Sequence, residues 1–196
     1  MQQDNKIAIA RVAVLPFMRL RSEDASVKAI RCPLCGSILR TEQFPQDAEK
    51  TVEDIFFSRL RDRKKVQIIS PETTAAVFDR ISAEDPKRPL PDMLKKVGTE
   101  LQSGGIVVGY VSRYRERKGY SYAAEQPASV TFEVHLVRTS DGAVVWKGLF
   151  DKTQQSLTEN MFQFFPFFKD KGKWLTAKEM VSENMDALLE NFPGFE

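Results

Sequence analysis

The strongest constraint on the fold is a β-hairpin pattern around residue 140. Between residues 130 and 136, apolar Val130, Phe132, Val134 and Leu136 alternate with polar side chains, as in a strand with one buried face. Asp141-Gly142 then supplies a tight turn, and the returning segment to Phe150 continues the apolar series. We expect an antiparallel pair here. The expected buried residues are Phe132, Val134 and Trp146, and the expected exposed residues are Glu133 and Lys147.

The remaining patterns place helices around this hairpin. Val12-Ala13-Val14-Leu15, closed by Pro16, reads as a central strand buried on both faces. Helical periodicity is expected over residues 47–64, from Ser70-Pro71 onward, over 91–102 and over 176–192, where Thr176 and Glu179 form a capping box. No Gly/Ser/Pro-rich linker divides the 196 residues. The order of elements predicts one α/β domain over residues 1–196, a sandwich of a mixed β-sheet with packed helices.

Charge and hydropathy say little about partners. The formal net charge is +2, and no apolar run approaches the roughly 20 residues of a membrane-spanning helix. The first six residues lack the apolar stretch of a secretory signal. Either the protein is cytoplasmic or a signal has been removed.

Three motifs in order resemble a known family. They are Val12-Ala13-Val14-Leu15-Pro16-Phe17, the segment from Lys96-Val97-Gly98 through Gly104-Gly105 to Tyr110, and the hairpin from Val134 to Trp146. Together they resemble bacterial envelope proteins with a TolB N-terminal-domain-like fold, as in CsgG-like and LpoB-like lipoproteins. The resemblance implies a periplasmic domain, lipid-anchored at the outer membrane, that binds other envelope components and has no shared catalytic residues. The chain departs from the pattern in a Cys-containing loop at 18–45 and a Phe-rich loop at 161–174, and it shows no signal or lipid-attachment cysteine.

The Cys-containing loop carries Cys32-Pro33-Leu34-Cys35-Gly36, which is half of a zinc knuckle. Four interpretations are open: a zinc site completed by a second subunit, a redox-active pair, a Cys32–Cys35 disulfide, or two inert thiols. These are the only two cysteines, and the one histidine, His135, is expected on the polar face of its strand, solvated or hydrogen-bonded. Two thiolates leave half of a zinc shell to water, so we expect no cofactor and no stoichiometric zinc in a monomer.

Two further segments are candidate binding sites. Residues 110–122 interleave tyrosines with cations, a composition suited to an anionic ligand but also to a protected edge strand. The candidate residues there are Arg113, Tyr114, Arg115, Arg117 and Lys118. The Phe-rich loop offers Phe167, Phe168 and Trp174 as partner-binding residues, with core packing or membrane contact as the alternatives. Scattered acidic residues argue against a nucleic-acid partner.

No serine–histidine–aspartate or paired-carboxylate signature can be placed, so we do not expect an enzyme. The leading hypothesis is a periplasmic adaptor or assembly protein, a lipoprotein at the outer membrane, anchored through a lipid outside the given chain. It would bind another envelope protein or itself. The alternative is a cytosolic metal- or redox-dependent protein that uses Cys32 and Cys35.

Overall fold

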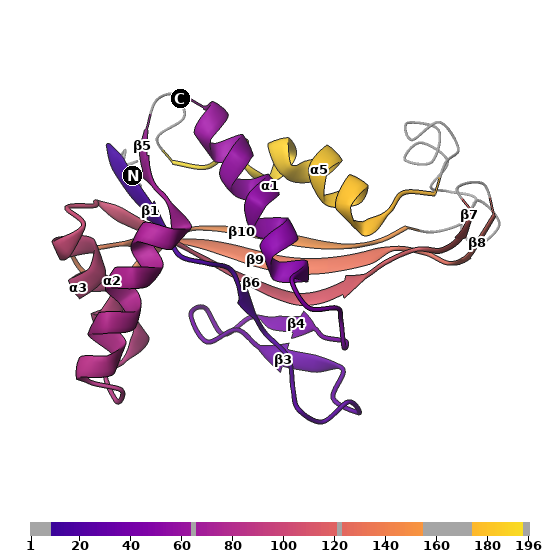
Figure 1. The fold of residues 1–196 in the computed structure, drawn as a ribbon, viewed down its shortest axis with the longest axis horizontal. Helices are drawn as coiled ribbons and strands as arrows, with labels where there is room; N and C mark the ends of the chain where they lie inside the picture. Colours follow the sequence, from indigo (N-terminus) through magenta and orange to yellow (C-terminus); the bar gives the residue numbers. More distant parts are fainter. Residues whose placement is uncertain (1–8, 64–65, 121–122, 155–173, 194–196) are drawn as a thin grey trace, which may run out of the picture.

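A six-stranded mixed sheet organises the fold (Figure 1). The computed structural model describes residues 9–63, 66–120, 123–154 and 174–193. The main path runs β10-β9-β6-β1-β5, and β2 also pairs with β6. The strands of this sheet are β1 (Arg11–Val14), β2 (Met18–Arg19), β5 (Gln67–Ile69), β6 (Gly105–Arg115), β9 (Ser129–Arg138) and β10 (Val144–Thr153). Strand β1 is parallel to β5 and β6, and β2 is parallel to β6. Strand β9 is antiparallel to both β6 and β10, so the predicted mixed sheet is confirmed.

The helices cover the two faces of the sheet. They are α1 (Ala48–Asp62), α2 (Pro71–Glu84), α3 (Leu90–Glu100) and α5 (Ala177–Leu188). Helices α1 and α5 lie side by side on one face, where Phe56 and Met185 join the core formed with Phe132 and Val134 (Figure 1). Helices α2 and α3 pack on the other face at the β1–β5 end, so the predicted sandwich of sheet and helices is confirmed.

Two of the helices begin where the sequence predicts. The hydroxyl of Ser70 accepts a hydrogen bond from the Thr73 amide at the start of α2, and Pro71 occupies the first turn. At α5 the Thr176 hydroxyl accepts from the Glu179 amide while the Glu179 carboxylate accepts from the Thr176 amide. This reciprocal capping box satisfies two amides that have no partner within the helix.

The predicted hairpin forms, with two corrections to the expected burial. Strands β9 and β10 pair antiparallel, Phe132 and Val134 are fully buried and Lys147 is exposed, as expected. Trp146, expected to be buried, is only half-buried against the core. The expectation that Glu133 is exposed is wrong, because this side chain is fully buried. The alternating pattern shows that one face of β9 is apolar, but it does not show that a second element covers the polar face.

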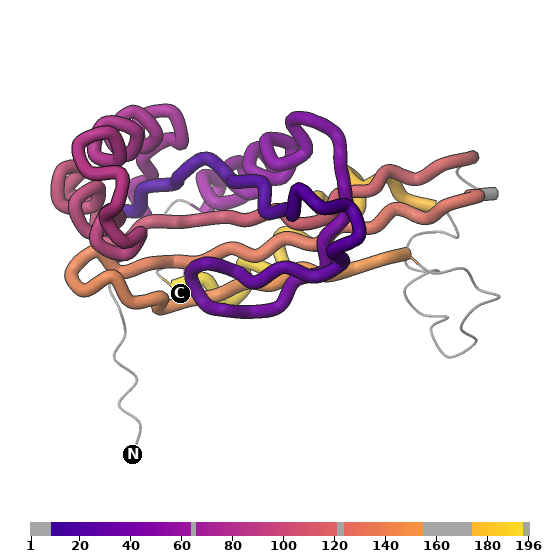
Figure 2. The backbone as a smooth tube through the Cα atoms, turned by 90° about the horizontal axis from the view of Figure 1, so that it is seen from below, coloured from indigo at the N-terminus to yellow at the C-terminus, as the bar shows by residue number. Residues whose placement is uncertain are grey.

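That covering element comes from the loop at 18–45. It contains a two-stranded ribbon, β3 (Ala29–Arg31) paired with β4 (Ile38–Arg40), which lies across the main strands on the face opposite α1 and α5 (Figure 2). The Ser112 hydroxyl of β6 donates to the Arg40 carbonyl at 2.8 Å, and the Glu42 amide donates to the Ser112 carbonyl at 3.2 Å. Cys32 and Leu39 of the ribbon are buried against the sheet.

The far end of the sheet carries a second small ribbon, β7 (Lys118–Tyr120) paired with β8 (Ala123–Gln126). None of the helices in the described parts of the chain is long and apolar enough to cross a membrane.

The rings of Phe132 and Phe150 are stacked, with centroids 5.0 Å apart. Truncating Phe132 should therefore destabilise the fold strongly. We expect Phe132→Ala to lower the free energy of unfolding by about 3–5 kcal/mol, because it leaves a cavity in a fully buried site. Tyr120→Ala is the matched control; this ring is 84% exposed, and its loss should change stability by less than about 0.5 kcal/mol. Urea unfolding measures both, and equal losses would contradict the described core.

Candidate metal centre

The Cys32-Pro33-Leu34-Cys35-Gly36 segment forms the turn that joins β3 to β4. The Gly36 amide donates to the Cys32 carbonyl at 3.0 Å, and the Cys32 amide donates to the Ser37 carbonyl at 2.8 Å. Gly36 has φ +76°, a left-handed conformation that side-chain-bearing residues rarely adopt. The amides of Leu34 and Cys35 point at the Cys32 sulfur, and the Ser37 amide points at the Cys35 sulfur. Amides aimed at sulfur stabilise a thiolate, so the turn has the local form of a metal-binding knuckle.

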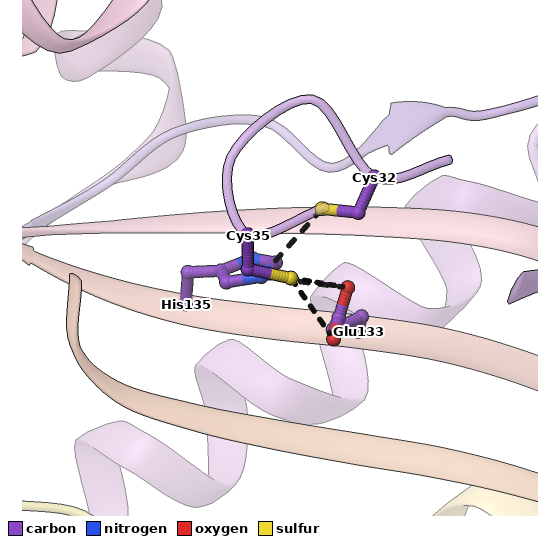
Figure 3. Close-up of side chains that lie close together, drawn as sticks. All are labelled: Cys32, Cys35, Glu133 and His135. Atoms are coloured by element: carbon purple, nitrogen blue, oxygen red, sulfur yellow. Dashed lines mark hydrogen bonds and ion pairs between the residues drawn. The ribbon is translucent and has the colours of Figure 1, made fainter. Parts of the chain in front are cut away.

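The other half of the site comes from β9. Glu133 and His135 are two residues apart, so both side chains project from the same face of the strand, toward the ribbon (Figure 3). Both are fully buried, as is Cys32, while Cys35 is exposed. We call Cys32, Cys35, Glu133 and His135 the Cys–Glu–His cluster.

The potential ligand atoms of this cluster all lie within 4.8 Å of one another. The Cys32 sulfur is 3.7 Å from His135 Nε2, and the Cys35 sulfur is 3.4 Å from both oxygens of Glu133. His135 Nε2 is 3.4 Å from Glu133 Oε2. Two sulfurs, one nitrogen and one carboxylate oxygen therefore converge on a single point.

The surrounding groups orient these atoms. His135 Nδ1 is 3.4 Å from the Val108 carbonyl, which can only accept, so Nδ1 carries a proton and Nε2 faces the cluster. Glu133 Oε1 accepts from the Ser37 hydroxyl at 3.0 Å and pairs with the Lys147 ammonium at 3.4 Å. Oε2 is thus the carboxylate oxygen nearest His135. Such outer contacts orient metal ligands in proteins.

Burial and hydrogen bonding shift the pKa values of the cluster residues in opposite directions. Burial raises the pKa of Cys32 to about 12. Burial also opposes the charged forms of Glu133 and His135. Their mutual hydrogen bond and charge attraction, together with hydrogen bonds involving the cysteines, outweigh it: the pKa of Glu133 falls to about 2 and that of His135 rises. For Cys35, burial raises the pKa, but hydrogen bonds from Ser37, His135 and Cys32 together outweigh it, so the pKa is lowered. Without metal, the cluster therefore holds an ionised carboxylate beside a protonatable imidazole.

This geometry differs from that of a nucleophilic triad. In a triad the imidazole contacts the nucleophile with one nitrogen and the acid with the other. Here the thiol of Cys32 and the carboxylate of Glu133 both approach Nε2, and Nδ1 bonds to the backbone. Cys32 is also 1% exposed, which leaves no room for a substrate. Convergence on one point is the arrangement that a metal ion requires.

Sequence reasoning identified half of this cluster. It singled out Cys32 and Cys35, and it expected His135 to be solvated or hydrogen-bonded on the polar face of its strand. The structure shows it buried and hydrogen-bonded, and it adds Glu133, which the sequence did not nominate. The spacing Glu-X-His on one strand face was the available signal. The two cysteines are free thiols in this structure, and a Cys32–Cys35 disulfide stays an alternative prediction.

The structure disperses the candidate anionic-ligand residues. Arg113 is buried and pairs with Asp151 at 2.5 Å, and Tyr114 is buried in the core shared with α1 and α5. Arg115 pairs with Glu42, Arg117 donates to the Trp174 carbonyl, and Lys118 is exposed. An anionic-ligand role stays a prediction, and the three cations nearest the surface are its best candidates.

The predicted partner-binding residues of the Phe-rich loop fall mostly outside the described part of the chain. Phe167 and Phe168 lie outside the described residues. Trp174 is described and is 8% exposed, with its indole in the interior at the start of the segment leading into α5.

Comparison with known proteins shows the fold. No protein-family model matches the sequence, and no curated protein matches it. The PelC dodecamer from Paraburkholderia phytofirmans is similar in structure, with a TM-score of 0.55 and 13% identity over 95% of this chain and 89% of that chain. The hypothetical protein CT253 from Chlamydia trachomatis has a TM-score of 0.52 and 14% identity over 96% and 98% of the two chains.

The LpoB C-terminal domain from Escherichia coli is a looser match, with a TM-score of 0.41 and 10% identity over 76% of this chain and 86% of that chain. This likeness is too loose to support a structural argument by itself. The chain thus has the fold of the PelC and CT253 structures, and the fold resemblance inferred from the sequence motifs is confirmed.

Because Cys35 is exposed and Cys32 is buried, the two thiols should differ in reactivity. In chelator-treated protein, iodoacetamide should modify Cys35 at least about tenfold faster than Cys32, because only Cys35 is exposed and burial disfavours the thiolate of Cys32. Mass spectrometry of peptides from Cys35→Ser and Cys32→Ser variants measures each rate separately. Equal rates in the folded protein would contradict the described position of Cys32, and urea-unfolded protein is the control in which the difference should vanish.

Proposed function

We propose that the chain is a non-enzymatic adaptor or assembly protein of the bacterial cell envelope that works by binding further copies of itself or other envelope proteins. The observation that carries this proposal is the structural likeness to PelC, which extends over 95% of this chain. The PelC structure is a dodecamer. A periplasmic position at the outer membrane, held by a lipid anchor outside the given chain, belongs to the same proposal.

The edge of the sheet offers a surface for such contacts. Strand β10 is an edge strand ten residues long, and within the described residues no other strand pairs with its outer side. Unpaired backbone groups on a long edge favour pairing with another chain. Leu149 on this strand is 49% exposed and Val144 is 37% exposed. Phe150 of the same strand and Leu188 of α5 line a shallow hollow beside it. A second copy of this chain is the partner we propose for this edge.

The Cys–Glu–His cluster favours a second candidate function, that of a cytosolic metal- or redox-dependent protein. A metal site is compatible with either compartment, so the cluster alone does not separate the two. Fractionation of cells that produce the full-length gene product does separate them. The first candidate requires the product in envelope membranes, and the second requires it in the cytosol.

Self-association through the β10 edge is directly testable. We expect the purified chain to form oligomers in sedimentation-velocity experiments, and we expect Leu149→Glu to weaken them at least about tenfold, because a carboxylate at a desolvated contact is costly. Ile38→Glu is the matched control, since this side chain is 63% exposed on the β3–β4 ribbon. Both variants should keep the thermal stability of the unmodified chain. A chain that is monomeric at all concentrations, or equal effects of the two variants, would contradict self-association through this edge.

A further inference from the structure

We propose that each chain binds one zinc ion through the four side chains of the Cys–Glu–His cluster. The ion fastens the β3–β4 ribbon to the face of the main sheet. The inference goes beyond the proposed envelope function, because it concerns a metal ion bound within one chain. It holds whichever partner the β10 edge binds.

The distances within the cluster fit a tetrahedral zinc site. With bonds of about 2.3 Å to sulfur and about 2.0–2.1 Å to nitrogen or oxygen, the edges of such a tetrahedron measure roughly 3.3–3.8 Å. The described separations are 3.7 Å between the Cys32 sulfur and His135 Nε2, and 3.4 Å from Glu133 Oε2 to both the Cys35 sulfur and His135 Nε2. Small side-chain adjustments suffice to seat the ion.

The structure removes the reason for expecting no zinc in a monomer. That expectation held that only two ligands are available in one chain, which leaves half of the coordination shell to water. Glu133 and His135 supply the missing half from β9. A second subunit is therefore unnecessary to complete the site.

The identity of the ligands selects zinc. Two thiolates and an imidazole are poor ligands for magnesium or calcium, which prefer oxygen, whereas sulfur and nitrogen in a tetrahedron are typical of zinc. The knuckle amides directed at both sulfurs stabilise the thiolates, and the Val108 carbonyl holds His135 with Nε2 toward the ion. The site has no open position for a substrate once all four ligands bind, which makes it structural rather than catalytic.

Charge balance supports the same assignment. Two thiolates and the Glu133 carboxylate bring three negative charges together beneath the ribbon. Zinc supplies two positive charges, and the Lys147 ammonium beside Glu133 Oε1 supplies the third. Buried charges are tolerated when they are compensated in this way. On binding, each of the two thiols loses its proton to solvent, as does His135 if its Nε2 is protonated, and no oxidation or reduction takes place.

The ion has a mechanical role in the fold. Strands β3 and β4 are three residues each, and a two-stranded ribbon of this size is marginal by itself. Outside the cluster, the ribbon is tied to β6 near Arg40 and by the burial of Leu39. The cluster lies at the opposite end, at the turn, so a metal there fixes the ribbon at both ends. Exposed Cys35 provides the path by which the ion enters.

The test uses the unmodified chain, reduced and stripped with a chelator, then supplied with zinc or cobalt. We expect one zinc per chain by native mass spectrometry and a rise in melting temperature of roughly 10 °C at a thousandfold excess over Kd. Cobalt should give the intense visible bands of a tetrahedral ion and a sulfur-to-cobalt charge-transfer band. Because this spectrum needs no substitution, it tests the site even where a variant fails to fold.

Variants assign the ligands. Cys32→Ser and Cys35→Ser each remove one of the two sulfur ligands, so each should halve or abolish the sulfur-to-cobalt charge-transfer band. His135→Gln and Glu133→Gln should each weaken zinc binding at least about tenfold. Glu72→Gln is the matched control, an exposed glutamate at the start of α2 that should leave zinc binding unchanged. Competition with a chromophoric chelator gives each affinity, and circular dichroism checks the fold.

Three results would overturn the proposal. The first is no zinc in reduced protein, with both thiols titrating as free or joined in a disulfide. The second is one zinc per two chains with cobalt spectra of a four-sulfur site, which would show a bridged dimer. The third is unchanged zinc affinity in both His135→Gln and Glu133→Gln. None of these results bears on self-association through Leu149, so the two proposals succeed or fail separately.

Discussion

The structure depends on the burial of a carboxylate in the middle of a sheet face. Glu133 has no exposure, and a charge in that position must be compensated or it destabilises the fold. The compensation comes from every side: His135 from the same strand, Lys147 from β10, and Ser37 and Cys35 from the ribbon. The ribbon therefore does more than cover apolar surface. It closes a polar site that the sheet alone would leave exposed, and the proposed zinc completes the same compensation with a divalent charge.

Much of the fold could be predicted from periodicity, and the cluster could not. The hairpin of β9 and β10, the central strand β1 and the capping box at α5 are local patterns, and each formed as predicted. The exposure of Glu133 was predicted wrongly because alternation reports only that one face of a strand is apolar. Covering the other face requires a contact between residues 32–37 and residues 133–135, about a hundred positions apart. No local pattern encodes that contact, so the two halves of the site appear unrelated in the sequence.

The two proposals, self-association and zinc binding, use different parts of one sheet: its edge and one of its faces. Helices α1 and α5 cover one face with apolar side chains, and the ribbon with its cluster covers part of the other. The edge strand β10 belongs to both accounts, because Lys147 points toward Glu133 while Leu149 is exposed two residues further along. In this chain the ribbon is attached to the sheet through polar contacts as well as through buried Leu39. We expect that attachment to be stable only when its charges are matched.

The central claim is that two sulfurs from the ribbon turn and two lighter atoms from β9 hold one metal. Zinc K-edge X-ray absorption on the reduced, zinc-loaded chain tests it most directly. The account predicts two sulfur neighbours at about 2.3 Å and two nitrogen or oxygen neighbours at about 2.0–2.1 Å, with the outer-shell scattering of one imidazole. A shell of four sulfurs would mean a site shared between chains, and a shell of only oxygen and nitrogen would mean zinc bound elsewhere. Either result would contradict the assignment of Cys32, Cys35, Glu133 and His135 as its ligands.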